Sequence, residues 1–284
     1  MVNQDIYAHA TPIVSKIAEN KTLVSVRNTI RKCMNIIGAI FLFIVLVGTT
    51  SAFDSSDVEA LERDNVCIKC DLDGVDLAGR NLRAADLRDS SMVGANLAGA
   101  NLAGANLAGA NLAGANLSSA RLSSANLTAV SMVGAGLMHS NLSGAKMNRA
   151  NLAGAHLSAS VLNKANLRQI VLIGANLERA DLSSADLTQA NLSYTNLFEA
   201  DLKYADLTES DLVLANLSYA DFEGANFTRA DLTKANLFRS NLTEANLSFA
   251  NMTEANLVDS RLDGAKFCET KISQSSQSGE DCEH

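Results

Sequence analysis

The sequence contains no tryptophan and only one proline, and aromatic residues make up just 5% of its 284 residues. Because hydrophobic residues nevertheless reach 47%, a sizeable core must be built from small aliphatic side chains. Residues 95–117 also lack any charged, histidine, cysteine, serine or aromatic residue. That stretch therefore holds no obvious acid, base, nucleophile or metal ligand, which argues against catalysis there.

Acidic residues are missing from one long segment, although the chain carries a formal net charge of -8. Between residues 90 and 177 there is no Asp or Glu, and there are five Lys or Arg residues. From residue 178 to the end, nineteen acidic residues stand against eight basic ones. The first segment is therefore neutral to basic, and the second is acidic.

A hydrophobic run at residues 34–47 follows three nearby basic residues, and small residues lead from it to Ala52. This order is typical of a signal peptide cleaved after Ala52. The uncharged stretch around the run also approaches the ~20 residues that span a bilayer, so an uncleaved anchor is the alternative. Either reading predicts export of everything after Phe53 to a periplasm or thylakoid lumen, with membrane contact limited to an uncleaved segment 34–52.

Every fifth residue from Leu72 to Phe267 is Leu, Met or Phe, at forty positions without an insertion or deletion. A step of five gives no single face on an α-helix, and an odd step alternates between the two faces of a strand. All forty side chains point inward only if the chain turns once in every five residues. Two positions before each of them, Ala occurs in 28 of 39 cases, which predicts a second, smaller inward side chain.

The repeated unit, Ala-(Asn/Asp)-Leu-x-Gly, resembles the units of pentapeptide repeat proteins over about 200 residues. The resemblance implies an all-β fold, a right-handed quadrilateral parallel β-helix of about ten coils with four pentapeptides in each. We expect four parts in the chain. They are a signal peptide or signal anchor at 1–52, an N-terminal cap at 53–70, the β-helix at 71–270 and a polar tail at 271–284.

Both ends of such a rod expose unpaired edges, so each end needs a cap, and the ends also offer a route to dimerisation. At the N-terminal end we predict a short helix from Asp57 to about Asp64 that lays Val58 and Leu61 over the first coil. Arg80 places a charge on an inward position near this end. We expect its side chain to reach an acidic residue of the cap.

The two ends also carry four cysteines, namely Cys67, Cys70, Cys268 and Cys282. About ten coils separate the two pairs, so a single metal site cannot include all four. A redox role for the CxxC pair would favour a βαβ setting, which the repeat does not provide. For an exported protein, our interpretation is that disulfides or buried thiols hold the caps, with redox activity and metal binding as the alternatives. The CxxC entry into Asp-Leu-x-Gly also resembles exported or thylakoid-lumenal pentapeptide repeat proteins of cyanobacteria and plastids.

Side chains twenty residues apart should stack on successive coils, which predicts columns of like charge in the acidic segment. One column contains Asp181, Asp201 and Asp221, and another contains Asp186 and Asp206. Carboxylates stacked about 5 Å apart repel one another, so we expect solvent ions, a basic partner or nearby basic side chains to offset them. The basic candidates are Lys203, Arg229 and Lys234.

Aromatic residues add to this surface, because Phe198 and Phe238 share one outward column with Val258. Tyr194 stacks below Leu214 in the same way, which predicts a mildly apolar flank on the acidic segment. Exposed aromatic side chains can mark a protein-binding surface. Together with the acidic columns they form the candidate partner-binding face, for a protein partner that the sequence does not name.

No triad, carboxylate dyad or glycine-rich phosphate loop stands out from the repeat, so we expect neither an enzyme nor a cofactor or metal site. The sequence therefore favours a non-catalytic exported rod that serves as a scaffold or protein-interaction module. The alternative is an acidic DNA-mimic inhibitor of a nucleic-acid enzyme, an activity known in the family that the chain resembles. The predicted export and the acid-free residues 90–177 argue against it, so nucleic acid is not an expected partner.

Overall fold

The computed structural model describes residues 54–272. The predicted signal segment at 1–52 and nearly all of the polar tail, from residue 273 onward, lie outside the described residues. Within the described range, no helix has the length and apolar character needed to span a membrane.

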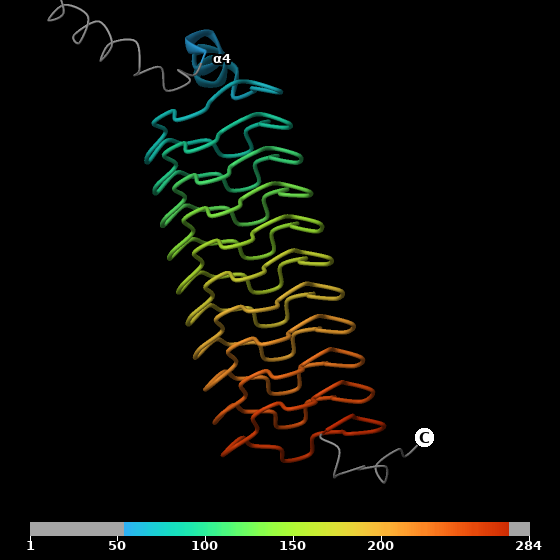
Figure 1. Ribbon diagram of the computed structural model, residues 1–284. Helices are drawn as coiled ribbons and strands as arrows, with labels where there is room; N and C mark the ends of the chain where they lie inside the picture. The colour runs from blue at the N-terminus through green and yellow to red at the C-terminus, as the bar shows by residue number, and fades with distance from the viewer. Residues whose placement is uncertain (1–53, 273–284) are drawn as a thin grey trace, which may run out of the picture. The chain divides into compact units, whose positions relative to one another are not determined.

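Residues 66–271 wind into coils of twenty residues, as the stacked turns in Figure 1 show. Each bridge is parallel and pairs a residue with the one twenty positions later, for example Asn151 with Val171. Each side of a coil supplies a single bridge residue instead of a longer strand, because the chain turns again within five residues. These features confirm the expected right-handed quadrilateral β-helix.

The core consists of the central Leu, Met and Phe side chains together with the small inward residues, and it is buried without interruption from Leu72 to Met252. Phe222 and Phe227 are among the largest fully buried side chains of this column, with their ring centroids 5.1 Å apart. The last three central residues differ from the prediction, since Leu257 and Phe267 are only half-buried and Leu262 is exposed. Within the described residues no further coil follows to cover them.

The corner of each repeat explains why Asn or Asp precedes the central residue. The side-chain oxygen of this residue accepts a hydrogen bond from the backbone N–H two positions later, as between Asn151 Oδ1 and Ala153 at 3.1 Å. This Asx turn satisfies a backbone group that faces away from the neighbouring coils. The next turn position has a positive φ, +65° at Gly154, which glycine adopts without steric cost.

The N-terminal cap is the helix α4, Ser55–Asp64. It begins two residues before the predicted start because the carboxylate of Asp54 accepts a hydrogen bond from Ser56 N–H at 2.9 Å and serves as the N-cap. Leu61 is buried and Val58 packs against the core, as predicted. The guanidinium of Arg80 lies 3.1 Å from Glu62, which confirms that this inward charge reaches an acid of the cap.

Candidate partner-binding face

The first predicted acidic column is present, because parallel bridges join Asp181 to Asp201 and Asp201 to Asp221. All three side chains are half-buried. One carboxylate oxygen of each is bound within its own turn, as in Asp201, which accepts from Lys203 N–H at 3.0 Å. The three carboxylates therefore lie on successive coils and present their second oxygens to further partners.

The second column, Asp186 and Asp206, is also bridged but lies on the neighbouring side of the coils, one pentapeptide further along the chain. A corner that includes Lys203 stands between the two columns. The structure therefore does not place all five carboxylates on one face. It divides them between two sides that meet at this corner.

Among the expected basic side chains, only Lys203 pairs with an acidic column, the first, whereas Asp186 of the second column pairs with Arg168 at 3.3 Å. Lys203 Nζ lies 3.2 Å from Asp221 Oδ2 and 4.0 Å from Glu223 Oε2. The hydrogen bond with Asp221, and then the attraction of the nearby carboxylates, raise the pKa of Lys203. The other two candidates were wrong, since Arg229 lies over the ring of Phe249 and Lys234 pairs with Glu254.

The predicted aromatic column is part of a larger cluster. The ring of Tyr219 lies between Phe198 and Phe238, with centroids 5.4 and 5.7 Å from its own, in edge-to-face geometry. The guanidinium of Arg239 lies 4.9 Å from the Phe238 centroid and also bonds Asp259 at 3.2 Å. This pairing with Asp259 raises the pKa of Arg239, so a permanent cation covers one end of the cluster.

Sequence reasoning missed Tyr219 because it compared Phe198 and Phe238 only with residues twenty apart, and it missed Arg239 because Arg239 stacks on Tyr219. Tyr219 is 21 positions after Phe198 and 19 before Phe238, so it occupies the neighbouring position of the same corner. Comparing both residues of each turn would have found it. Tyr194 and Leu214 are exposed as expected, but they lie at a different corner, one pentapeptide earlier, and do not extend this cluster.

The aromatic corner leads directly into the first acidic column, since Asp201 follows Phe198 by three residues and Asp221 follows Tyr219 by two. Carboxylates and aromatic rings therefore lie side by side along several coils. We call this surface the acidic–aromatic face. It consists of Asp181, Asp201, Asp221, Phe198, Tyr219 and Phe238.

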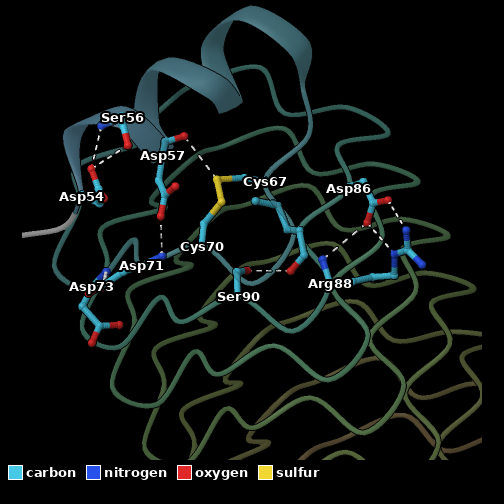
Figure 2. Close-up of a disulfide and its surroundings, with 11 residues drawn as sticks. Asp54, Ser56, Asp57, Cys67, Cys70, Asp71, Asp73, Asp86, Arg88 and Ser90 are labelled. Atoms are coloured by element: carbon cyan, nitrogen blue, oxygen red, sulfur yellow. Dashed lines mark hydrogen bonds and ion pairs between the residues drawn. A yellow bond between two sulfur atoms is a disulfide. The ribbon is translucent and has the colours of Figure 1, made fainter.

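At the N-terminal end, Cys67 and Cys70 are joined by a disulfide beneath α4 (Figure 2). Cys67 Sγ lies 3.2 Å from the carbonyl oxygen of Asp57, and a carboxylate oxygen of Asp57 accepts from Asp71 N–H at 2.8 Å. The disulfide and Asp57 thus connect the helix to the entry into the first coil. Both sulfurs are buried.

The same three side chains resemble a metal cluster, because the Asp57 carboxylate and the sulfurs of Cys67 and Cys70 lie within 4.8 Å of one another. A disulfide sulfur is not a thiolate, however, and the thiolate is the form that binds metal. In the disulfide state neither sulfur can therefore act as a thiolate ligand. At the other end Cys268 is also disulfide-bonded, and Cys282 lies outside the described residues.

Comparison with known proteins supports the architecture. The family model for pentapeptide repeats matches eight copies, in stretches from 70–107 to 235–274. No curated protein matches the chain. Among solved structures, QnrB1, a plasmid-mediated fluoroquinolone resistance protein, is 15% identical, with 70% of this chain and 92% of QnrB1 covered and a TM-score of 0.52. At that identity the likeness shows the fold alone.

Two further structures come from photosynthetic organisms. HetL, a pentapeptide repeat protein involved in heterocyst differentiation regulation in Nostoc sp. strain PCC 7120, is 28% identical, covering 82% of this chain and 100% of HetL with a TM-score of 0.39. A pentapeptide repeat protein from the Arabidopsis thaliana thylakoid lumen is 30% identical, covering 37% of this chain and 63% of that protein with a TM-score of 0.16.

Proposed function

Because the chain belongs to the pentapeptide repeat family, and its outward residues gather into an acidic–aromatic face, we propose that it is a non-catalytic rod that binds a protein partner through this face. The observation that carries the proposal is the contact of Tyr219 with both phenylalanines directly beside the carboxylate column. Aromatic side chains are enriched among the residues that dominate binding energy at protein interfaces.

The chemistry of this face favours a basic partner. Asp181 and Asp201 have no ion-pair partner among the described residues, whereas Asp221 is paired with Lys203. Arg or Lys side chains of a partner would relieve the repulsion within the column, and apolar groups would cover the rings of Phe198 and Tyr219. Complementary charge of this kind raises the association rate and selects the partner.

We further propose that this rod works after export across a membrane. Support comes from the hydrophobic run 34–47 and from the disulfide at Cys67 and Cys70, since disulfides persist in oxidising compartments. A reporter enzyme that is active only outside the cytoplasm, fused after the last residue, should therefore be active in cells. Activity of a cytoplasm-only reporter at the same position would contradict export.

An acidic mimic of DNA is the alternative, and the fold shared with QnrB1 is compatible with it. A mimic needs a continuous array of negative charge that resembles the phosphates. Residues 90–177 interrupt any such array, because they contain no acid and five basic residues. We therefore place protein binding first.

The binding proposal is tested with three full-length proteins, the wild type and two triple variants. In one, Asp181, Asp201 and Asp221 are changed to Lys. In the matched control, Asp211, Asp231 and Glu254, which lie on other sides of the coils, are changed to Lys. Each protein is cross-linked in its native exported fraction, and the captured proteins are quantified.

A partner that is captured by the wild type and the control, but not by the Asp181/Asp201/Asp221 variant or by Tyr219→Ala, would support binding through the acidic–aromatic face. Equal capture by all variants, or equal loss in the control, would show that the acidic–aromatic face does not bind the partner. Thermal unfolding of each variant checks that the rod remains folded.

A further inference from the structure

A hollow of about 400 Å³ lies at the start of the acid-free segment and extends to Arg83 in the coil before it. It is lined mainly by outward residues of four successive coils, which lie on the same side of the rod as the acidic–aromatic face but nearer the N-terminal cap. The lining includes two arginines, one histidine and several short polar side chains. The residues used below are Arg83, Arg121, His139, Ser119, Ser123 and Asn141.

The hollow forms where short side chains lie next to the two arginines. Parallel bridges join Asn101 to Arg121 and Arg121 to Asn141, so these residues lie on neighbouring coils about 4.8 Å apart. Arg83, Ala103 and Ser123 occupy the same turn position on three successive coils, and Arg83 is the one nearest the cap. The short side chains of Ala103 and Ser123 leave open space in the lining that also includes Arg83 and Arg121.

The positive charge in this hollow is not balanced within the described residues. Neither Arg83 nor Arg121 forms an ion pair there, in contrast to Arg80, which pairs with Glu62. No Asp or Glu occurs between residues 90 and 177, so the coils around Arg121 contribute no acid to the hollow. Arg83 lies in the preceding coil, whose Asp86 and Asp89 are not among the residues that line the hollow. His139 adds a ring N–H donor to the same space. The hollow therefore combines several hydrogen-bond donors with an excess of cations.

We propose that this hollow binds a phosphorylated small polar molecule, such as a sugar or polyol phosphate. The planar guanidinium group donates two parallel hydrogen bonds to phosphate oxygens, which makes Arg121 and Arg83 suitable phosphate ligands. The hydroxyls of Ser119 and Ser123 and the amide of Asn141 can bond the hydroxyls of the ligand. The volume falls within the range of small-molecule sites.

The lining also restricts which phosphate compounds fit. It contains no Phe, Tyr or Trp, so the small imidazole of His139 is the one ring in the lining, and the apolar members are only Ala103 and Ala120. Base stacking on aromatic side chains is a main source of affinity for nucleobases. A polyhydroxylated phosphate ester is therefore a better match than a nucleotide. This site is separate from the acidic–aromatic face, so its test does not depend on the protein partner.

The experiment is calorimetric titration of the full-length chain with three probes: inorganic phosphate, glucose 6-phosphate and glucose. We expect saturable binding of glucose 6-phosphate, weaker binding of phosphate and none of glucose. Arg121→Gln should raise the Kd for glucose 6-phosphate at least about tenfold, because it removes a charge-assisted pair of hydrogen bonds. Arg83→Gln should raise it by a smaller factor.

Arg149→Gln is the matched control, since Arg149 is another exposed arginine of the acid-free segment and bonds only Gln169 at a different corner. It should change the Kd less than about twofold. Equal weakening by Arg149→Gln, or no saturable binding of either phosphate probe up to about 20 mM, would overturn the proposal.

Phosphatidylglycerol vesicles, compared with phosphatidylcholine vesicles, test a lipid headgroup as the source of the phosphate. Vesicle binding that Arg121→Gln abolishes, without binding of soluble esters, would assign the hollow to a membrane lipid and overturn a small-molecule ligand. Thermal unfolding confirms that each exposed Arg→Gln variant stays folded.

Discussion

The acid-free coils at 90–177 and the acidic coils at 178–272 share one backbone but expose different chemistry. Leu152 in the first and Leu212 in the second are both fully buried, and the N–H of each donates to the next coil at 2.7 Å. Outside, the first segment has no carboxylate, whereas the second contains the acidic columns and the aromatic cluster. The fold therefore depends on the inward positions, and the outward positions are free to specify partners.

The contrast is sharpest along a single side of the coils. Arg121 lies in the cationic hollow, and Asp181, Asp201 and Asp221 follow it at the same position on later coils. At this bridge position, Val161 lies between Asn141 and Asp181. One side of the rod thus carries, near the cap, arginines with no ion pair among the described residues and, on later coils, a column of carboxylates, separated by an apolar position.

The largest expected effect tests whether the two interiors are equivalent. Leu152→Ala and Leu212→Ala should each lower the local free energy of unfolding by about 2–5 kcal/mol, because each leaves a cavity in a closely packed column. The values should agree within about 1 kcal/mol, since both sites have the same burial and pairing. Amide hydrogen exchange measured coil by coil gives each value.

Half-buried turn positions of the same two segments provide the control for this comparison. Ser158→Ala and Ser248→Ala change outward turn residues and should alter stability by less than about 0.5 kcal/mol. If Leu212→Ala cost much more than Leu152→Ala, the acidic surface would be straining the interior beneath it. The separation of inward structure from outward chemistry would then fail.

The sequence predicts most of the fold because the forty-position period permits one arrangement of the inward side chains. It also predicts the acidic columns, since residues twenty apart must stack. The contacts between neighbouring columns depend on side-chain rotamers and on the two residues of each corner. For this reason Tyr219 and the hollow around Arg121 were not predicted, and the pairing of Arg229 and Lys234 was predicted wrongly.

The cap shows the same limit on a smaller scale. Alternating charged and apolar residues predict a helix over the first coil, but Ser55, Ser56 and Asp57 offer several equivalent starts. Asp54 becomes the N-cap because Asp57 is needed elsewhere, where its carboxylate accepts from Asp71 N–H. That second role comes from the packing of the helix on the coil, and the local sequence does not reveal it.

A smaller effect distinguishes two inward serines that occupy the same position of the coil, Ser140 in the acid-free segment and Ser240 in the acidic one. Ser240 Oγ donates to the carbonyl of Leu237 at 2.8 Å, whereas the buried Ser140 Oγ has no hydrogen-bond partner among the described residues. An unsatisfied buried hydroxyl destabilises the folded state.

Ser140→Ala should therefore raise the local free energy of unfolding by about 1 kcal/mol, and Ser240→Ala should lower it by about 0.5–1 kcal/mol. Hydrogen exchange at the flanking amides measures both changes. Because the two substitutions are chemically identical, each is the control for the other. A loss of stability in Ser140→Ala would mean that this hydroxyl is bonded in solution.

The smallest effect concerns charge. Lys203→Met removes the cation beside Asp221 and Glu223 and leaves the acidic column without its internal partner. We expect the thermal midpoint to fall by about 1 °C at low ionic strength and to recover as added salt screens the carboxylates. Lys146→Met, in the acid-free segment, is the matched control and should show no such recovery.

The pH dependence of the Lys203→Met effect follows from the raised pKa of Lys203. A group whose pKa is higher in the folded state contributes stability that is complete below its unfolded pKa and is lost as the pH rises through the folded value. The difference between Lys203→Met and the wild type should therefore be constant at neutral pH and vanish only at pH values above the ordinary lysine pKa of 10.5. A difference that already disappears near pH 8 would show that the pairing with Asp221 does not stabilise the acidic coils, and that their repulsion is relieved by solvent ions.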